Sequence, residues 1–203
     1  MENMNIDLPF EVKKILDKIS ENGFEAYVVG GCVRDSVINK MSQDNTVAKK
    51  EPNDWDICTS ALPTEILEIF SQEKIIKTGL KHGTVTLVTA ENTNYEITTF
   101  RSDGEYKDFR HPQKVQFVTS LRADLSRRDF TVNAMAYSPK TGIIDYFGGK
   151  EDILNRQIKC VGKAEERFCE DALRIMRALR FSSALGFDIE EKTGTAIKIC
   201  KEN

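Results

Sequence analysis

The segment Asp54-Trp55-Asp56-Ile57 constrains the fold of this chain more than any other short stretch. In a β-strand successive side chains point to opposite faces, so the two aspartates would share one face while Trp55 and Ile57 share the other. The apolar face needs a core, and two neighbouring carboxylates need water or a counter-charge. We therefore predict a strand at 55–59, with Asp56 in it and Asp54 directly before it, and we expect both aspartates to face a polar site.

The paired carboxylates indicate a metal site. Two carboxylates held side by side repel each other unless a cation offsets their charge. Mg²⁺ prefers one or two carboxylates together with substrate phosphates, so Asp54 and Asp56 are candidate Mg²⁺ ligands and candidate catalytic residues for phosphoryl chemistry. Taken alone, such a pair is also common on the solvated edge strand of a sheet, and this alternative stays open.

Glu96 is a third candidate ligand. It lies between Tyr95 and Ile97 in another β-prone run. If that run pairs with the strand of Asp56, the Glu96 carboxylate reaches the same face and completes the metal site. The alternative is a surface residue on an alternating strand, because pairing cannot be read from local sequence.

A glycine pair follows a β-prone run at 25–29 and precedes a helix predicted at 32–38. Gly30 and Gly31 let backbone N–H groups approach an anion, and the N-terminus of the next helix attracts negative charge. Arg34 adds a guanidinium fork that can grip phosphate oxygens. We interpret the segment as a triphosphate site, although a lone Gly-Gly pair is most often an ordinary turn.

The other segments predict a mixed α+β fold. Helices are predicted from apolar periodicity and start signals at 10–20, 63–70 and 125–137. Strands are predicted from β-branched and aromatic runs at 55–59, 84–89, 95–100 and 114–118. We expect these strands to form one sheet. The polar residues 39–53 predict a loop.

A second, helical unit is expected after Gly148-Gly149, so we place one unit at 1–148 and another at 149–203. Residues 165–186 are strongly helical. Their apolar stripe consists of Ala172, Ile175, Met176 and Leu179. The last residues look like an incomplete helix, and we expect the second unit to be truncated.

Composition excludes several classes of protein. The chain of 203 residues is 40% hydrophobic and 30% charged, and no apolar run approaches the roughly 20 residues that span a bilayer, so no membrane partner is expected. The polar N-terminus lacks the features of a secretion signal, which favours a cytoplasmic protein. Five cysteines without a CxxC pair disfavour a zinc site and a disulfide framework. With a net charge of -3, any nucleic-acid contact must come from a local basic patch or from a part of the protein outside this sequence.

Five ordered motifs resemble those of the class II tRNA nucleotidyltransferase and bacterial poly(A) polymerase family. They are Gly30-Gly-Cys-Val-Arg-Asp35, Asp54-Trp-Asp-Ile-Cys-Thr59, Arg127-Arg-Asp-Phe-Thr-Val-Asn-Ala-Met-Ala136, Asp145-Tyr-Phe-Gly-Gly149 and Glu170-Asp-Ala-Leu-Arg174. The resemblance covers residues 24–187. Five motifs in the right order are far more specific than any one of them.

The resemblance implies a polymerase-β-like nucleotidyltransferase head, a mixed sheet with flanking helices, followed by the start of an all-helical neck. It implies that the two aspartates bind the catalytic metals and that the glycine turn and Arg34 contact the incoming triphosphate. Three further residues would hold the nucleotide: Arg128, Asp129 and Asn133. From the residues alone, the Arg-Arg-Asp run would equally suit a salt-bridge cluster at a helix N-terminus. Residues 145–149 would act as a hinge.

The resemblance also implies that Asp171 and Arg174 read the base of the incoming nucleotide, with Arg177 helping to position it. A carboxylate accepts from an exocyclic amine and a guanidinium donates to ring acceptors, so the pair suits this task. Residues three apart lie on one side of a helix, and the pair could then face a cleft together. A surface ion pair is the alternative.

We therefore expect an RNA 3'-hydroxyl to attack the α-phosphate of CTP or ATP and release pyrophosphate, with Mg²⁺ as cofactor and tRNA as partner. CCA addition is favoured over poly(A), A-only or C-only addition, and over an inactive nucleotide-binding module, which would not need paired carboxylates. No obligate protein partner is inferred, and neither His82 nor His111 is assigned a role. The loop at 39–53 is longer than the resemblance implies. Family members continue into further helical regions, so we expect this chain to bind tRNA poorly.

Overall fold

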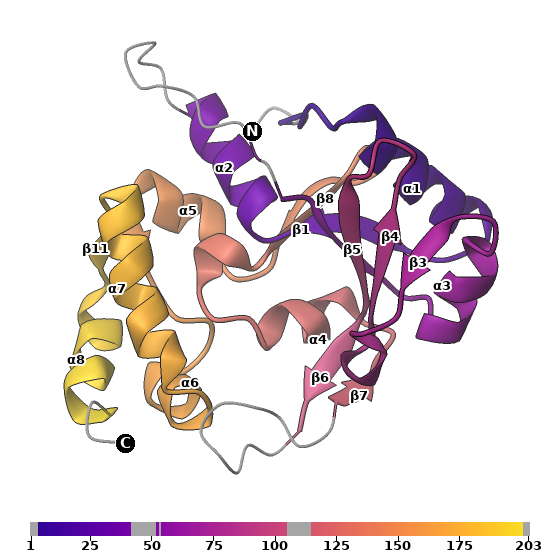
Figure 1. The fold of residues 1–203 in the computed structure, drawn as a ribbon. Helices are drawn as coiled ribbons and strands as arrows, with labels where there is room; N and C mark the ends of the chain where they lie inside the picture. Colours follow the sequence, from indigo (N-terminus) through magenta and orange to yellow (C-terminus); the bar gives the residue numbers. More distant parts are fainter. Residues whose placement is uncertain (1–3, 42–51, 53, 105–114, 201–203) are drawn as a thin grey trace.

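The computed structural model describes residues 4–41, 52, 54–104 and 115–200, and its centre is a seven-stranded sheet in the order β3-β4-β5-β2-β1-β8-β9 (Figure 1). Strands β2 and β5 run parallel, and the other neighbouring pairs run antiparallel. The seven strands are β1 (Ala26–Val29), β2 (Asp56–Thr59), β3 (Lys74–Ile76), β4 (Thr84–Val88), β5 (Asn94–Thr99), β8 (Met135–Ser138) and β9 (Gly142–Asp145).

Side chains that alternate along the central strands fill two cores on opposite faces of the sheet. Val28 and Ile57 belong to the main core, whereas Val29 and Cys58 belong to a smaller one. Helix α4 supplies Leu121 to the smaller core. The helices of this part are α1 (Phe10–Glu21), α2 (Gly31–Met41), α3 (Pro63–Ile69) and α4 (Leu121–Ser126), with single 3-10 turns η1 (Leu80–His82) and η2 (Thr131–Asn133).

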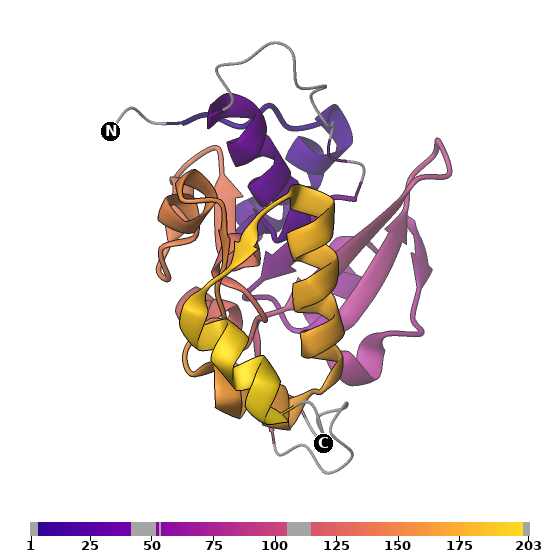
Figure 2. The same cartoon turned by 90° about the vertical axis from the view of Figure 1, so that its left-hand side faces the viewer.

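The C-terminal quarter of the chain is mainly helical and lies to one side of the sheet, the side that faces the viewer in Figure 2. Phe168 and Ala178 extend the main core into it. Its elements are α5 (Gly149–Leu154), β10 (Gln157–Ile158), α6 (Ala164–Glu170), α7 (Leu173–Leu185), β11 (Asp188–Ile189) and α8 (Glu191–Cys200), with β10 and β11 paired in parallel. No helix in the described part of the chain is both long enough and apolar enough to cross a membrane.

The predicted α+β class and most predicted elements are confirmed. The helices predicted at 10–20, 32–38 and 63–70 correspond to α1, α2 and α3. The strands predicted at 25–29, 55–59, 84–89 and 95–100 correspond to β1, β2, β4 and β5. The predicted loop at 39–53 lies mostly outside the described residues, and α2 extends to Met41.

The helix predicted at 125–137 is wrong. The helix in this region is α4, which begins and ends earlier in the chain. The Ser120 hydroxyl caps its start by accepting a hydrogen bond from Ala123 N at 3.4 Å. The chain then makes one 3-10 turn and continues as β8, whose Tyr137 and Ala136 pair with β1 and whose four residues are all buried. A short apolar run fits a buried strand as well as a helix, and pairing with β1 and β9 decides between them.

The prediction of one sheet is also wrong for the strand at 114–118. Its described part, β7 (Val115–Phe117), pairs with β6 (Arg101–Asp103) in a separate two-stranded sheet. The short strand β6 follows β5 after Phe100, whose fully buried side chain lies in the smaller core. This packing sets the point at which the chain leaves the main sheet.

The helix predicted at 165–186 is interrupted. It divides into α6 and α7 because Asp171 adopts an extended conformation with φ -143° and ψ 103°. The apolar stripe does not form a core face, since Met176 is 63% and Leu179 is 47% exposed. Instead, α7 buries Arg174 and Ala178.

Gly149→Ala is expected to lower the free energy of unfolding by about 1–3 kcal/mol, because overpacking a close contact forces the backbone to move. A Cβ on Gly149 would lie 2.3 Å from the carbonyl oxygen of Thr131, where α5 packs on η2. Thermal or urea unfolding measures the effect. Gly194→Ala is the matched control, because its Cβ would lie at an ordinary 3.9 Å from the nearest atom, in Ile189. Equal stability of Gly149→Ala and wild type would contradict the packing argument.

Candidate nucleotide-binding and active site

The glycine turn between β1 and α2 forms one wall of the site. Gly30 has φ +79°, a conformation that favours glycine, and a Cβ there would lie 3.3 Å from Nη1 of Arg128. Gly31 begins α2. The predicted strand, glycine turn and helix are therefore present, and the turn leaves room for an arginine directly above it.

The two aspartates lie at the start of β2, as the alternation predicted. Trp55 and Ile57 are 8% and 1% exposed, whereas Asp54 and Asp56 are solvent-accessible. Desolvation by the surrounding walls raises the pKa of Asp56, and the Asp54 charge raises it further against the opposing effect of Arg128. The charged form of Asp56 is therefore disfavoured until a cation joins the site.

The donor set suits a hard divalent cation that keeps part of its coordination for phosphate oxygens. Asp54 and Asp56 line the same cavity. Across the described residues, no group of three or more His, Cys, Asp or Glu side chains is arranged to hold a metal by itself. Two carboxylates are nevertheless what Mg²⁺ needs when a substrate provides phosphate oxygens.

Glu96 lies on the strand next to the aspartates, as its predicted role required. The parallel pairing of Ile57 with Ile97 sets β5 beside β2. The Glu96 carboxylate is exposed and lines a smaller cavity together with Asp56, but not the main cavity that holds both aspartates. Its role as a metal ligand stays a prediction.

A chain of polar contacts connects α2, the η2 segment and α7. Arg34 Nη1 donates to Asn133 Oδ1 at 2.6 Å, and Asn133 Nδ2 donates to Asp129 Oδ1 at 3.4 Å. Arg177 Nε donates to the other Asp129 oxygen at 2.7 Å. Phe181 of α7 lies under both guanidinium groups, with Arg34 and Arg177 each 5.3 Å from the ring centroid. Four of the predicted residues therefore hold one another in place.

The fully buried carboxylate of Asp124 orients two arginines at the edge of the site. It accepts hydrogen bonds from Arg127 at 2.8 and 3.0 Å, from Arg128 at 3.4 Å and from the backbone of Arg101 at 3.2 Å. Burial alone would raise the pKa of Asp124, but the two guanidinium groups lower it below its usual value. Burial likewise opposes the charge of Arg128, yet Asp124 and, to a smaller extent, Asp56 raise its pKa.

Asp171 and Arg174 both line the cavity. They do not do so from one side of a single helix, as predicted. Asp171 lies in the break before α7, where its Oδ1 accepts from Leu173 N at 3.0 Å. Arg174 is 6% exposed and donates to Glu170 Oε2 at 2.7 Å. The second terminal nitrogen of its guanidinium group, Nη2, donates to the carbonyl oxygen of Arg127 at 3.3 Å. Arg174 therefore joins α7 to the Arg-Arg-Asp segment.

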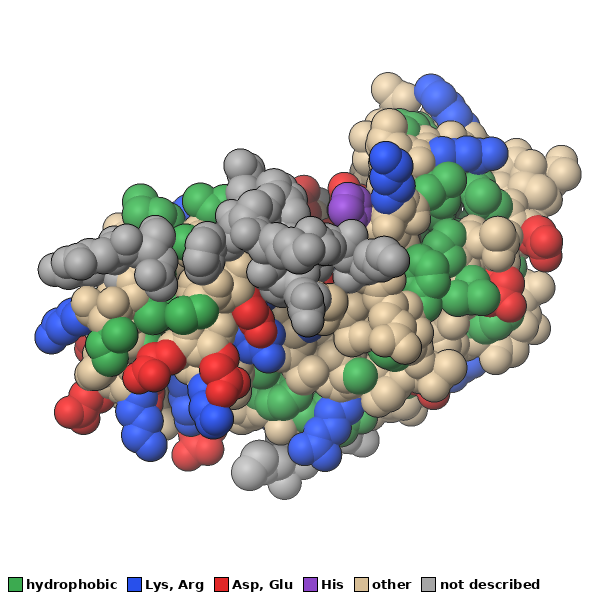
Figure 3. All heavy atoms as spheres, turned by 90° about the horizontal axis from the view of Figure 1, so that it is seen from below, with side chains coloured by type: hydrophobic (Ala, Val, Ile, Leu, Met, Phe, Trp, Pro, Cys, Tyr) green, Lys and Arg blue, Asp and Glu red, His purple; other side chains and the backbone are tan. Residues whose placement is uncertain are grey.

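These residues surround one cavity of about 750 Å³. All predicted site residues except Glu96 line it. Eight further residues that were not predicted as site residues also line it: Cys32, Asp35, Pro52, His82, Arg101, Asp103, Arg127 and Phe181. Cys32, Asp35 and Arg127 lie within the quoted motifs, and Pro52 lies two residues before one. Arg101 and Asp103 come from β6, and local sequence gave no signal for them. On the face in Figure 3, acidic and basic side chains are interspersed at the end formed by α6–α8.

A cavity walled by a glycine turn, paired carboxylates and arginines is typical of α+β domains that bind phosphate esters. Residues 26–159 match a family described as the poly A polymerase head domain, and the chain belongs to that family. The five ordered motifs resembled this family, and the match confirms that prediction.

The relatives that the chain resembles are named CCA-adding enzymes. It is 50% identical over 198 residues to the enzyme of Lactobacillus delbrueckii subsp. bulgaricus and 51% identical over 184 residues to that of Bacillus cytotoxicus. These matches cover 97% and 91% of this chain, but 47% and 43% of the relatives. The chain therefore spans less than half the length of the relatives that it matches.

Solved structures agree with this relationship. The CCA-adding enzyme of Bacillus stearothermophilus in complex with CTP superposes with a TM-score of 0.80 at 45% identity, over 95% of this chain and 43% of that one. The Thermotoga maritima CCA-adding enzyme complexed with tRNA_CCA gives a TM-score of 0.74 at 28% identity, over 95% and 41%. The mixed sheet and its helices therefore have the same arrangement as the corresponding part of these two enzymes.

Proposed function

We propose that this chain is the catalytic part of a tRNA nucleotidyltransferase that adds CCA to the tRNA 3' end from CTP and ATP. One observation carries the proposal: the glycine turn, the paired aspartates, the Arg-Arg-Asp segment and α7 converge on one cavity. Similarity to CCA-adding enzymes along more than nine-tenths of the chain supports the specific activity. A cytoplasmic location, where tRNA is processed, is part of the proposal.

In this proposal the triphosphate lies against Gly30 and Gly31, between Arg34 and Arg128. Arg34 is 7% exposed and already held by Asn133 and Asp35, at 2.6 and 2.8 Å. A guanidinium that is fixed before binding loses little conformational entropy when the phosphate arrives. The Nε of Arg128 is buried and has no hydrogen-bond partner within the described part of the chain, which leaves it a donor for an anion.

Asp54 and Asp56 would hold Mg²⁺, with Glu96 as the candidate for a further ligand. When bound, the ion would lower the pKa of the attacking hydroxyl and stabilise the leaving oxygens. The raised pKa of Asp56 supports this assignment, because two adjacent carboxylates are costly without a cation.

The proposed reaction exchanges one bond to the α-phosphorus for another and releases the hydroxyl proton. The RNA 3'-oxygen bonds to the α-phosphorus, the bond from that phosphorus to the bridging oxygen breaks, and pyrophosphate leaves. The hydroxyl proton passes to solvent. Asp171 would accept from the amine of cytosine or adenine while Arg174 donates to the ring, and Asp129 would hold Arg177 beside them.

The proposal divides the chain into a catalytic head at 1–148 and a neck at 149–203, with a hinge at 145–149. The Asp145 carboxylate connects the two parts at this point, because its Oδ1 accepts from Gly149 N and its Oδ2 from Lys150 N, each at 2.9 Å. One side chain thereby fixes the direction in which α5 leaves β9.

The test is incorporation of radiolabelled CTP and ATP, separately and together, into tRNA that ends before the CCA sequence. We expect two cytidines and then one adenosine, with Mg²⁺, and no product from Asp54→Ala. Repeated adenosine, or only one kind of nucleotide, would replace the proposed activity with poly(A), A-only or C-only addition. No incorporation by this chain or by a version extended to the length of its relatives would refute it.

A further inference from the structure

A second cavity, of about 190 Å³, opens from Asp56 in another direction. The main cavity extends from Asp56 towards the β1–α2 turn, whereas the second extends towards Thr98 of β5 and Thr84 of β4. Strands β1 and β5 flank β2 on opposite sides. The two cavities share Asp56 and three arginines, so they meet at the proposed reaction centre.

Two threonine hydroxyls form part of the wall of this second cavity. Thr84 and Thr98 are directly opposite in the β4–β5 ladder, and their Oγ1 atoms are 3.0 Å apart. Both side chains are half-buried, and the exposed Glu96 carboxylate lines the same cavity. Hydroxyl groups both donate and accept hydrogen bonds, and a carboxylate accepts them, so this wall complements a group that carries hydroxyls of its own.

We propose that the second cavity receives the terminal ribose of the RNA acceptor and that Thr84 and Thr98 recognise its 2'-hydroxyl. The inference rests on the proposed function and deepens it. Phosphoryl transfer places the attacking and leaving oxygens roughly in line, so the acceptor must reach the α-phosphate from the side opposite the pyrophosphate. With the triphosphate at the glycine turn, that side of Asp56 is the second cavity.

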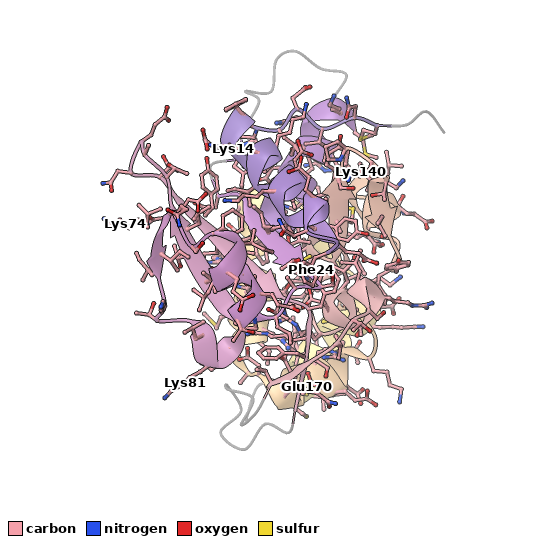
Figure 4. The ribbon with its side chains drawn as sticks, turned by 90° about the vertical axis from the view of Figure 1, so that its right-hand side faces the viewer. Lys14, Phe24, Lys74, Lys81, Lys140 and Glu170 are labelled. Carbon is pink, nitrogen blue, oxygen red and sulfur yellow. The ribbon has the colours of Figure 1, made fainter. Side chains whose placement is uncertain are left out.

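The charges around the cavity suit the end of an RNA strand. Arg101 and Arg127 line it and can contact the last internucleotide phosphate. Farther out, Lys74 and Lys81 are exposed at the edge formed by β3 and η1 (Figure 4). Cations at that edge can contact phosphates farther along the strand without reading sequence.

The test compares two labelled RNA hairpins that end in the first cytidine of the CCA sequence and therefore take CTP next, one with a terminal ribose and one with a terminal 2'-deoxyribose. Fluorescence anisotropy measures their Kd values for the 203-residue protein with a CTP analogue that cannot be cleaved between the α- and β-phosphates. Since each lost hydroxyl contact weakens binding severalfold, the wild type should prefer ribose by about fivefold. The double variant Thr84→Val/Thr98→Val should lose that preference and keep the wild-type Kd for the CTP analogue.

Thr86→Val is the matched control, because Thr86 lies on the same face of β4 but does not line the cavity. Valine suits strands, so the variants should keep the wild-type Tm. An equal ribose preference in the double variant, or no preference in the wild type, would overturn the inference. Binding is read without turnover, so a failed incorporation assay would count against the proposed function while the ribose preference still decides the acceptor site.

Discussion

Asp56→Asn is expected to lower nucleotide incorporation by roughly 10²–10³-fold. The variant loses a carboxylate that would hold Mg²⁺, and removing one group that stabilises the charge of a transition state costs about this much. The same change should raise the Tm of the metal-free protein. The Tm should rise because the pKa of Asp56 is raised in the folded protein: desolvation and the Asp54 charge disfavour the ionised carboxylate there. Incorporation assays and thermal melts in EDTA measure the two effects, which have opposite signs.

The pH dependence tests this cause. A carboxyl whose pKa is raised by folding destabilises the protein above its folded pKa, and this cost disappears as the pH falls through that value. The stability advantage of Asp56→Asn should therefore shrink as the pH is lowered. Mg²⁺ should raise the Tm of the wild type but not of the variant, since only the wild type gains a ligand for the folded state.

Asp188→Asn is the control for this variant, because Asp188 is exposed and does not line either cavity. It should leave incorporation and the Mg²⁺ effect unchanged. If Asp56→Asn melts below the wild type in EDTA, the Asp56 charge stabilises the fold and the argument from its pKa is wrong. If the variant incorporates nucleotide at the wild-type rate, Asp56 is not an active-site residue.

Asp171→Asn is expected to reduce the preference for CTP over UTP by about 10–100-fold, because each good contact to a base edge contributes about 1–3 kcal/mol of discrimination. The wild-type carboxylate can only accept, which suits the amine of cytosine. An asparagine also donates and can therefore tolerate the O4 atom of uracil. Competitive incorporation of CTP and UTP into the same acceptor measures the ratio.

Two features keep this second test interpretable. The amide oxygen of asparagine can still accept the hydrogen bond from Leu173 N that Asp171 accepts at 3.0 Å, so α7 should keep its start. Glu166→Gln is the control, because Glu166 is exposed and pairs with Lys163 away from the cavity lining. An unchanged CTP preference in Asp171→Asn would exclude this residue from base selection.

The sequence by itself determined the features of the fold and the site that depend on residues close together in the chain. The alternation at 54–57 set the aspartates apart from the core, and strand, glycine turn and helix followed one another as predicted, because strand geometry and glycine conformations act locally. The ordered motifs likewise indicated the family that residues 26–159 confirm. Apolar periodicity failed at 125–137 and in the stripe of α7, where short apolar runs gave no information about their partners.

Only the tertiary structure decided which of these residues meet. Arg34 contacts Asn133 across 99 positions, and Asp129 contacts Arg177 across 48. The same holds for β8, which is a strand because β1 and β9 lie on either side of it, and for Glu96, which lines the smaller cavity because β5 lies beside β2. Backbone geometry acts between neighbours in the chain, whereas strand pairing and polar contacts between distant residues depend on groups that only folding brings together.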